Sequence, residues 1–207
     1  RIIEELCTEC GTWADTIIRD IAVCADLNVY FAKARLAEQM HAFPPTLTDD
    51  GVILLKKARH PLIPYKKAVP ISFTLGDTYQ ALIITGPNTG GKTVALKTCG
   101  LLTLMAMSGM LIPAAEGSRI SVFNNVLADI GDTQSIEQNL STFSAHMRSV
   151  IEILEQADRH SLVLLDELGS GTDPIEGAAL AEAVIQRLKD NGAKLMVTTH
   201  YQELKLY

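Results

Sequence analysis

The segment that most constrains the fold of this chain is Gly86–Thr93, which reads Gly-Pro-Asn-Thr-Gly-Gly-Lys-Thr. An apolar run, Ala81–Thr85, leads into this segment, and a helix-like run leads out of it from Val94. Glycines spaced in this way between a strand and a helix let backbone N–H groups and a helix N-terminus surround an anion. The segment therefore predicts a phosphate-binding loop carried by an α/β fold.

The residue types in this loop predict that it binds ATP or ADP together with Mg²⁺. The Lys92 ammonium is expected to reach the β- and γ-phosphates, and the Thr93 hydroxyl to ligate the metal. The adenine contact is assigned to the region of residues 69–71, where no aromatic side chain is available to stack. The expected nucleotide-binding residues of the loop are Gly86, Pro87, Asn88, Thr89, Gly90, Gly91, Lys92 and Thr93.

A second motif is the apolar run Ser161–Leu165 followed by Asp166 and Glu167. Such a run predicts a strand buried on both faces. A strand that ends in aspartate is typical of a Walker-B site, where the carboxylate holds Mg²⁺ beside the phosphate loop. The next carboxylate, Glu167, is placed to act as general base on a water molecule, which favours hydrolysis over transfer to a small acceptor.

Three further segments are given a possible role in the site because of their position relative to these motifs. His200 ends an apolar strand and is interpreted as a γ-phosphate sensor, although an isolated histidine is more often structural. The turn-rich segment 169–177 can form a contact surface beside the γ-phosphate. Residues 139–147 predict a helix start with capping hydroxyls, whose N-terminus could bind a phosphate held by another subunit.

The chain is predicted to contain two parts, a helical segment over residues 1–43 and an α/β domain over residues 44–207. Apolar residues recur every three or four positions in the first part and predict one buried face: Ile3, Leu6, Cys10, Trp13, Ile17, Ile21 and Cys24. An interruption is expected near Asp26–Asn28, and Pro44 ends the run. Such a helix is interpreted as a lever between domains or, equally, as half of a coiled pair. In the second part, strands are expected at 52–55, 71–75, 81–85, 121–123, 126–130, 161–166 and 195–199, and helices at 92–108, 137–157 and 177–191. This alternation predicts a central, mostly parallel sheet.

Composition narrows the function further. The net charge of −6 argues against a broad basic surface for nucleic acid within this chain. No apolar run approaches the roughly 18–20 residues of a membrane helix, and no signal peptide is visible. The cysteine usage predicts a reducing, cytoplasmic setting. The chain begins with Arg1, which suggests a piece of a longer protein. Cys7 and Cys10 form a single C-x-x-C, which is interpreted as two small apolar helix residues rather than a zinc or redox site.

The motifs together resemble the MutS family, a branch of the ABC-type P-loop ATPases. Five of them occur in the order and spacing of the family: Ala58-Arg-His-Pro61, Gly86–Thr93, Ser141-Thr-Phe143, Asp166-Glu-Leu-Gly-Ser-Gly-Thr172 and Thr199-His-Tyr-Gln-Glu-Leu204. The resemblance covers about residues 50–207. It is strongest to the type-two branch, a bacterial paralogue without mismatch repair activity, on the following segments: Asp129-Ile-Gly-Asp132, Ser135-Ile-Glu-Gln138, Ser141–His146 and Gly171-Thr-Asp-Pro174.

The resemblance implies a dimer that sandwiches each nucleotide between two subunits, with Ser141 of one subunit facing the γ-phosphate of the other. It implies that Glu167 is the hydrolytic base, that His200 is the sensor and that Asn88 lies near the γ-phosphate. Residues 1–41 would end the long helices that join the ATPase to a clamp.

For the whole protein, the resemblance implies binding to branched DNA or to stalled ribosomes and their rRNA, and suppression of homologous recombination. Endonuclease activity would belong to a C-terminal Smr domain that this sequence lacks. A nucleotide-gated binding module with incidental hydrolysis remains an alternative. A transport or chromosome-maintenance ATPase is disfavoured because no Leu-Ser-Gly-Gly signature occurs, and a small-molecule kinase is disfavoured by the Asp166-Glu167 pair.

Overall fold

The computed structural model describes residues 1–87, 90–131, 139–201 and 204, with the side chains of helix α4 described from Ser144 onwards. The chain divides into two compact units, Arg1–His41 and Ala42–Tyr207. No helix among the described residues is both long enough and apolar enough to cross a membrane.

The first unit consists of the helices α1 (Ile2–Thr12) and α2 (Ala14–Met40). The helices are separated at Trp13, and α2 continues through 26–28, so the interruption expected there is wrong. The helix ends at His41, whose left-handed conformation (φ 51°) closes it.

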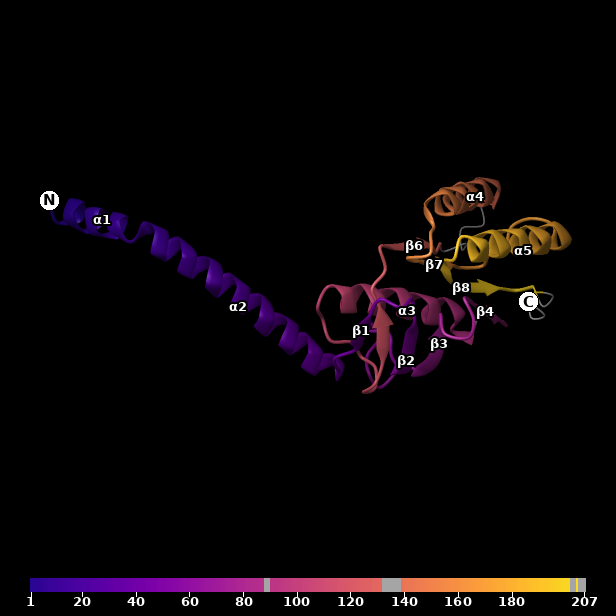
Figure 1. Cartoon of the computed structure of the whole chain (residues 1–207), viewed down its shortest axis with the longest axis horizontal. Coiled ribbons are helices and arrows are strands. Elements are labelled where there is room, and N and C mark those ends of the chain that lie inside the picture. The colour runs from indigo at the N-terminus through magenta and orange to yellow at the C-terminus, as the bar shows by residue number, and fades with distance from the viewer. Residues whose placement is uncertain (88–89, 132–138, 202–203, 205–207) are drawn as a thin grey trace. The chain divides into compact units, whose positions relative to one another are not determined.

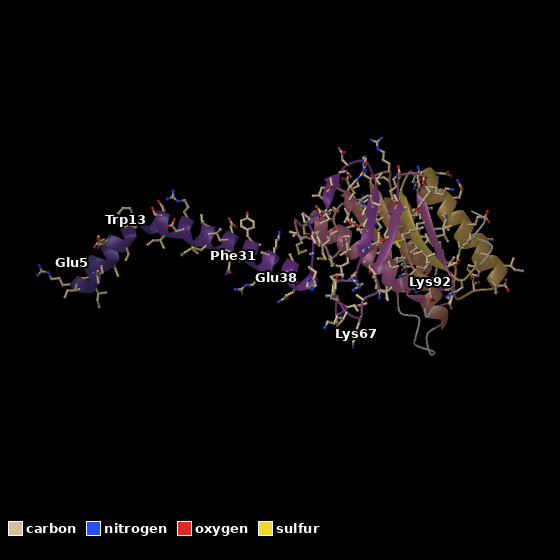
Figure 2. All side chains as sticks on the ribbon, turned by 90° about the horizontal axis from the view of Figure 1, so that it is seen from below. Glu5, Trp13, Phe31, Glu38, Lys67 and Lys92 are labelled. Carbon is tan, nitrogen blue, oxygen red and sulfur yellow. The ribbon has the colours of Figure 1, made fainter. Side chains whose placement is uncertain are left out.

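The apolar face predicted for this unit is present in sequence but is not buried. Ile3 and Trp13 are 76% and 60% exposed, and the labelled side chains of Trp13 and Phe31 project from the helix surface (Figure 2). Helical periodicity shows which residues could pack together, but burial also requires a partner element. Within the described residues of this unit, only Ala37 is a buried apolar side chain.

The second unit contains two sheets, where the sequence predicted one mostly parallel sheet. The first is mixed, in the order β1 (Thr46–Thr48), β5 (Arg119–Ser121), β2 (Ile53–Ala58) and β3 (Ile71–Leu75). Strands β2 and β3 pair antiparallel. No helix connects them, and a parallel pair normally needs a crossover connection, usually a helix.

The second sheet carries the predicted motifs and is entirely parallel, in the order β4 (Ala81–Thr85), β8 (Lys194–Thr199), β7 (Ser161–Leu165) and β6 (Asn125–Asp129). Its strands alternate with the helices α3 (Lys92–Met107), α4 (Asn139–Gln156) and α5 (Pro174–Asp190). Because all four strands run in the same direction, their carboxyl ends share one edge.

The helices cover both faces of this sheet, with α4 and α5 on one side and α3 on the other (Figure 1). Val163, Leu165, Leu195 and Val197 belong to the core shared with α4 and α5. The alternate residues of these strands point to the opposite face, which α3 covers. Leu164 packs so closely against Gly100 of α3 that a β-carbon on Gly100 would overlap it. All five residues of β7 are buried, which confirms the prediction of a strand covered on both faces.

Several element boundaries differ from the predictions. Helix α5 begins at Pro174 instead of 177, because the Asp173 side chain accepts from the N–H groups of Ile175 and Glu176 and a proline fits the first helical position. The strand expected at 121–123 is β5, at Arg119–Ser121, and the three-residue strand β1 was not predicted. The predicted start of α4 at 137 lies outside the described residues.

The four cysteines are all free thiols. Cys7 and Cys10 are exposed on α1, and the described residues contain no group of three or more side chains that could hold a metal ion. Cys99 is buried in α3, and burial raises its pKa to about 12, so it packs as a small apolar residue.

Candidate active site

The register of the parallel sheet brings the predicted motifs together. Thr85 of β4 pairs with Thr199 of β8, so the phosphate loop and His200 leave neighbouring strands at the same edge. On the other side of β8, Leu165 of β7 pairs with Val197, so Asp166 lies beside Thr198. Segments that are about 110 residues apart in the sequence therefore meet at one edge.

Lys92 is the first residue of α3 and follows Gly91, which takes a left-handed conformation (φ 77°) that glycine adopts without strain. Its side chain is only 5% exposed, and its Nζ donates a hydrogen bond to the Gly86 carbonyl oxygen. It forms no ion pair with any carboxylate among the described residues. A buried ammonium without a counter-charge is costly, so this position suits a bound anion.

His200 bridges Lys92 and Glu167. Its Nδ1 lies 3.4 Å from Lys92 Nζ, and its Nε2 lies 3.4 Å from Glu167 Oε1. Because the lysine nitrogen can only donate, Nδ1 is the acceptor, and the ring hydrogen is assigned to Nε2, which faces the carboxylate. The base and sensor predicted from the sequence are thus in contact with each other and with the phosphate-loop lysine.

Glu167 has an unusual backbone conformation, with φ at 50°. Non-glycine residues in this region are uncommon and are concentrated at functional sites. Its N–H donates to Thr198 Oγ1 at 2.8 Å, and the Leu168 N–H donates to the Thr198 carbonyl oxygen at 3.0 Å. These bonds to β8 hold the strained residue at the end of β7.

Thr198 is a functional position whose role the sequence reasoning missed. Its side chain is fully buried, and its hydroxyl donates to Asp166 Oδ1 while accepting from the Glu167 N–H. The predicted metal ligand, Asp166, is itself only 7% exposed. One hydroxyl therefore orients both acidic residues. The signal in the sequence that could have identified it is a threonine two residues before His200, on the strand next to β7.

The remaining loop residues lie at the same edge. Gly86 has a φ of 139°, and the Gly90 N–H donates to the Pro87 carbonyl oxygen at 3.1 Å. Thr93 is the second residue of α3 and is half-buried. The predicted contacts Asn88 and Thr89 lie outside the described residues, as do Gln202 and Glu203 of the motif that follows the last strand.

A cavity of about 300 Å³ adjoins the phosphate loop. Its walls include Gly90 and Gly91, the side chains of Val94 and Ala95 in α3, and residues 67–69 and Ile71, where the adenine contact was predicted. Arg59 holds this wall in place, since its guanidinium donates to the Ala68 carbonyl oxygen and stacks on Tyr65 at 4.4 Å. A pocket of this size and largely apolar lining is typical of a small-ligand site.

His60 also lines this cavity. Burial lowers its pKa, and the positive charge of Lys97 lowers it further, so the imidazole is neutral at pH 7. The sequence singled out His60 only as part of the Ala58–Pro61 motif.

The turn-rich segment after Glu167 is fastened to the end of β8. The Tyr201 hydroxyl donates to the Gly169 carbonyl oxygen at 2.7 Å, and burial raises the pKa of this phenol, with a smaller contribution from the nearby Asp173 charge. The tip of the segment is open to solvent, with Ile175 82% exposed. The start of the segment stays close to Glu167, since the Ser170 N–H donates to the Glu167 carbonyl oxygen at 3.0 Å. A contact surface beside a γ-phosphate stays a prediction.

Ser141 lies in the first turn of α4 by its backbone, while its side chain is outside the description. Further along the same helix, His146 Nδ1 lies 2.8 Å from Asp129 Oδ2 at the end of β6. In the sequence, Asp129 and His146 stand out only as parts of the segments that carry the resemblance, and no role was predicted for either.

Known proteins resemble this chain over its whole length. The family model described as MutS domain V matches residues 82–207. A protein named Endonuclease MutS2 from Lachnospira eligens is 54% identical over 206 residues, which is all of this chain and 26% of that protein. Proteins of the same name from Clostridium botulinum (strain Loch Maree) and Brevibacillus brevis are each 53% identical, also over the full chain and 26% of their length.

These matches confirm the resemblance, including its type-two character. The chain spans about a quarter of the length of these curated relatives. The family model begins inside β4 and extends over the phosphate loop, the acidic pair and His200. The chain belongs to the MutS family and carries its domain V.

Proposed function

We propose that the chain is a P-loop ATPase of the ABC type, which binds and hydrolyses ATP at the carboxyl edge of the parallel sheet. The observation that carries this proposal is the continuous Lys92–His200–Glu167 arrangement, with 3.4 Å at each step. A buried ammonium, a histidine and a carboxylate in contact are the groups required for a phosphate contact, a sensor and a general base.

In this proposal, Lys92 and the N–H groups of the loop bind the β- and γ-phosphates, and ADP occupies the same site. Glu167 accepts the proton of the attacking water, and His200 keeps that carboxylate near the γ-phosphate position. Mg²⁺ held by Thr93 and Asp166 would neutralise charge on the phosphate oxygens. The donor set fits this ion, because a carboxylate can accept from Thr198 with one oxygen and ligate with the other.

The cavity beside Gly90 and Gly91 is proposed to hold the adenine base. It adjoins the phosphate loop, its volume of about 300 Å³ suits a small ligand, and apolar side chains such as Val69 and Ile71 line it. Neutral His60 can form a hydrogen bond with a base without adding charge to the pocket.

The active form is proposed to be a homodimer in which Ser141 completes the site of the partner subunit. This follows from the family resemblance, and the exposed side chain of Ile175, in the segment that follows Glu167, is consistent with an interface there. Hydrolysis per subunit is therefore expected to rise with protein concentration.

The whole protein is proposed to use this cycle to open and close a clamp on branched DNA, stalled ribosomes or both, with α1 and α2 as part of the lever. The relatives are named endonucleases. We propose that this activity and suppression of recombination belong to the complete protein, with nuclease chemistry in a region outside these 207 residues. In the alternative, nucleotide occupancy gates the binding and hydrolysis is incidental.

The test is Glu167→Gln, compared with Glu182→Gln on the exposed surface of α5. We expect Glu167→Gln to reduce kcat for ATP by about 100-fold or more while ATP still binds and still promotes association. The control variant should hydrolyse ATP at the wild-type rate. Turnover can be followed by phosphate release and nucleotide binding by calorimetry.

Unchanged hydrolysis in Glu167→Gln would remove this residue as the base. If the variant loses hydrolysis but the complete protein still binds DNA or ribosomes in a nucleotide-dependent way, the gated module is the better description. Failure of the wild-type protein to bind ATP with Mg²⁺ would reject the nucleotide site itself.

A further inference from the structure

The contact between Asp129 and His146 joins the end of β6 to α4. Asp129 is the last residue of β6, and His146 lies in α4, with the ring Nδ1 donating to the carboxylate at 2.8 Å. The side chains are only 14% and 26% exposed, respectively. A charge-assisted bond in such partial burial is stronger than an exposed ion pair.

The same pair lies directly against the acidic residues of the candidate site. Asp129 pairs in register with Leu165, and its carbonyl oxygen accepts from the Asp166 N–H at 2.9 Å. Asp129 and His146 share a cavity of about 20 Å³ with Asp166 and Glu167. Such a volume holds about one water molecule, so there is little space for the ring to take another position.

The backbone after β6 is built tightly around this ring. A β-carbon added to Gly131 would lie 2.7 Å from His146 Cε1 and 3.1 Å from Nε2. Real β-carbons essentially never approach another atom to within 3.0 Å, so a side chain at position 131 would displace the ring. The ring is therefore held on one side by Asp129 and on the other by the chain at Gly131.

This contact attaches the N-terminal half of α4 to the end of β6. The far end of α4 is fixed by apolar packing, because Val150 and Ile153 belong to the buried core, as does Ala157 directly after the helix. Ser141 precedes His146 by five residues, or about 7.5 Å along the helix axis. His146 thus attaches α4 to β6 at a position close to Ser141 in the sequence.

We propose that Asp129 and His146 are positioning residues that hold the Ser141 turn of α4 in place relative to the end of β7, and thereby set the rate of ATP turnover in the partner subunit. The inference rests on the proposed ATPase function. It adds that the pair acts across the dimer, through Ser141, and makes no contribution to nucleotide binding within its own subunit.

The first test uses the complete gene product with Asp129→Asn, His146→Leu and His146→Asn. Asparagine keeps an N–H donor near the position of Nδ1, whereas leucine keeps bulk and helix propensity but has no donor. We expect Asp129→Asn and His146→Leu to lower kcat about 10- to 100-fold, with the Kd for ATP within about 3-fold of wild type. His146→Asn should retain most of the activity, and Asp129→Asn combined with His146→Leu should be no slower than the slower single variant.

Asp50→Asn is the matched control, because it breaks another ion pair, with Arg119, in the mixed sheet. It should leave kcat unchanged. Circular dichroism and Tm confirm folding of each variant. If His146→Leu does not fold, Asp129→Asn, which keeps the size of the side chain, still decides the question.

The second test is complementation between two slow variants, Glu167→Gln and His146→Leu. A mixed dimer contains one site with an intact Glu167 in one subunit and an intact His146 in the other. If the pair acts across the dimer, mixing should restore about a quarter of the wild-type rate, since about half of the dimers are mixed and each has one competent site. If the pair acts within its own subunit, mixing restores nothing.

The outcomes separate this inference from the function on which it rests. Wild-type hydrolysis with unchanged kcat in both Asp129→Asn and His146→Leu overturns the inference and leaves the ATPase intact. A loss of ATP affinity that equals the loss of kcat, or an absence of complementation, also overturns it. A wild-type protein that binds no ATP rejects the proposed function first.

Discussion

At the scale of single residues, the candidate site depends on one buried hydroxyl. Thr198 donates to Asp166 and accepts from the Glu167 N–H, and nothing of its side chain is exposed. Thr198→Val keeps the shape of the side chain but leaves a buried carboxylate oxygen and a backbone N–H without their partner. We expect the free energy of unfolding to fall by about 1–3 kcal/mol and kcat to fall with it. Chemical denaturation and phosphate release measure the two effects.

Thr103→Val is the control for this substitution. Thr103 is equally buried, but its hydroxyl donates only to the Cys99 carbonyl oxygen one turn earlier in α3. That carbonyl also accepts a hydrogen bond within the helix. Removing the Thr103 hydroxyl should therefore lower the free energy of unfolding by well under the roughly 1 kcal/mol typical of a buried hydrogen bond. Equal losses of stability in the two variants would contradict the role assigned to Thr198.

The residues whose positions could be predicted are those within local motifs. Lys92, Asp166 and Glu167 each follow from a loop or strand end that is readable over a few residues. Thr198 and the Asp129–His146 contact could not be predicted in the same way, because they depend on which strands are neighbours and in what register. A strand order of β4-β8-β7-β6 puts His200 between the lysine and the glutamate, and no local pattern encodes that order.

At the scale of elements, the start of α5 is packed against the segment that follows Glu167. A β-carbon on Gly177 would overlap both the Gly169 carbonyl oxygen and the Tyr201 hydroxyl. Alanine normally stabilises a helix relative to glycine by about 1 kcal/mol. Here we expect Gly177→Ala to destabilise the protein by about 1–3 kcal/mol, because the backbone carbonyl cannot move aside without displacing the segment next to the base.

Gly11→Ala tests the ordinary effect of the same substitution. A β-carbon on Gly11 of α1 would meet nothing within 4 Å, so this variant should gain helix content by circular dichroism. Gly177→Ala should instead lower the midpoint of chemical denaturation. A neutral or stabilising effect at Gly177 would show that the α5 start and the Gly169 segment are free to separate.

The elements also show where sequence patterns were insufficient. Strands 71–75 and 81–85 were predicted with their observed bounds, since a short apolar pattern and flanking turn residues are local signals. Their assignment to two different sheets was not predicted, because strand pairing depends on the connections: no helix separates β2 from β3, whereas helices separate β6, β7 and β8.

At the scale of the whole molecule, the two units differ in how their apolar residues are used. All eight strands and every buried apolar side chain except Ala37, among the described residues, lie in the unit Ala42–Tyr207. The helices of Arg1–His41 instead expose large apolar side chains, including Ile2, Trp13 and Phe31. A helix with this surface is stable in water only when another element covers it.

We therefore expect residues 42–207 to fold without residues 1–41. The truncated protein should unfold in one cooperative transition, with a Tm within about 4 °C of the 207-residue chain, because a 1 kcal/mol change shifts the Tm of a domain of this size by about 2–4 °C. It should also associate less, since exposed apolar side chains drive association. Calorimetry and light scattering after size-exclusion chromatography measure these properties. Loss of near-ultraviolet circular dichroism or strong dye binding by the truncated protein would contradict this division, because it would mean that the core of 42–207 needs the helices to form.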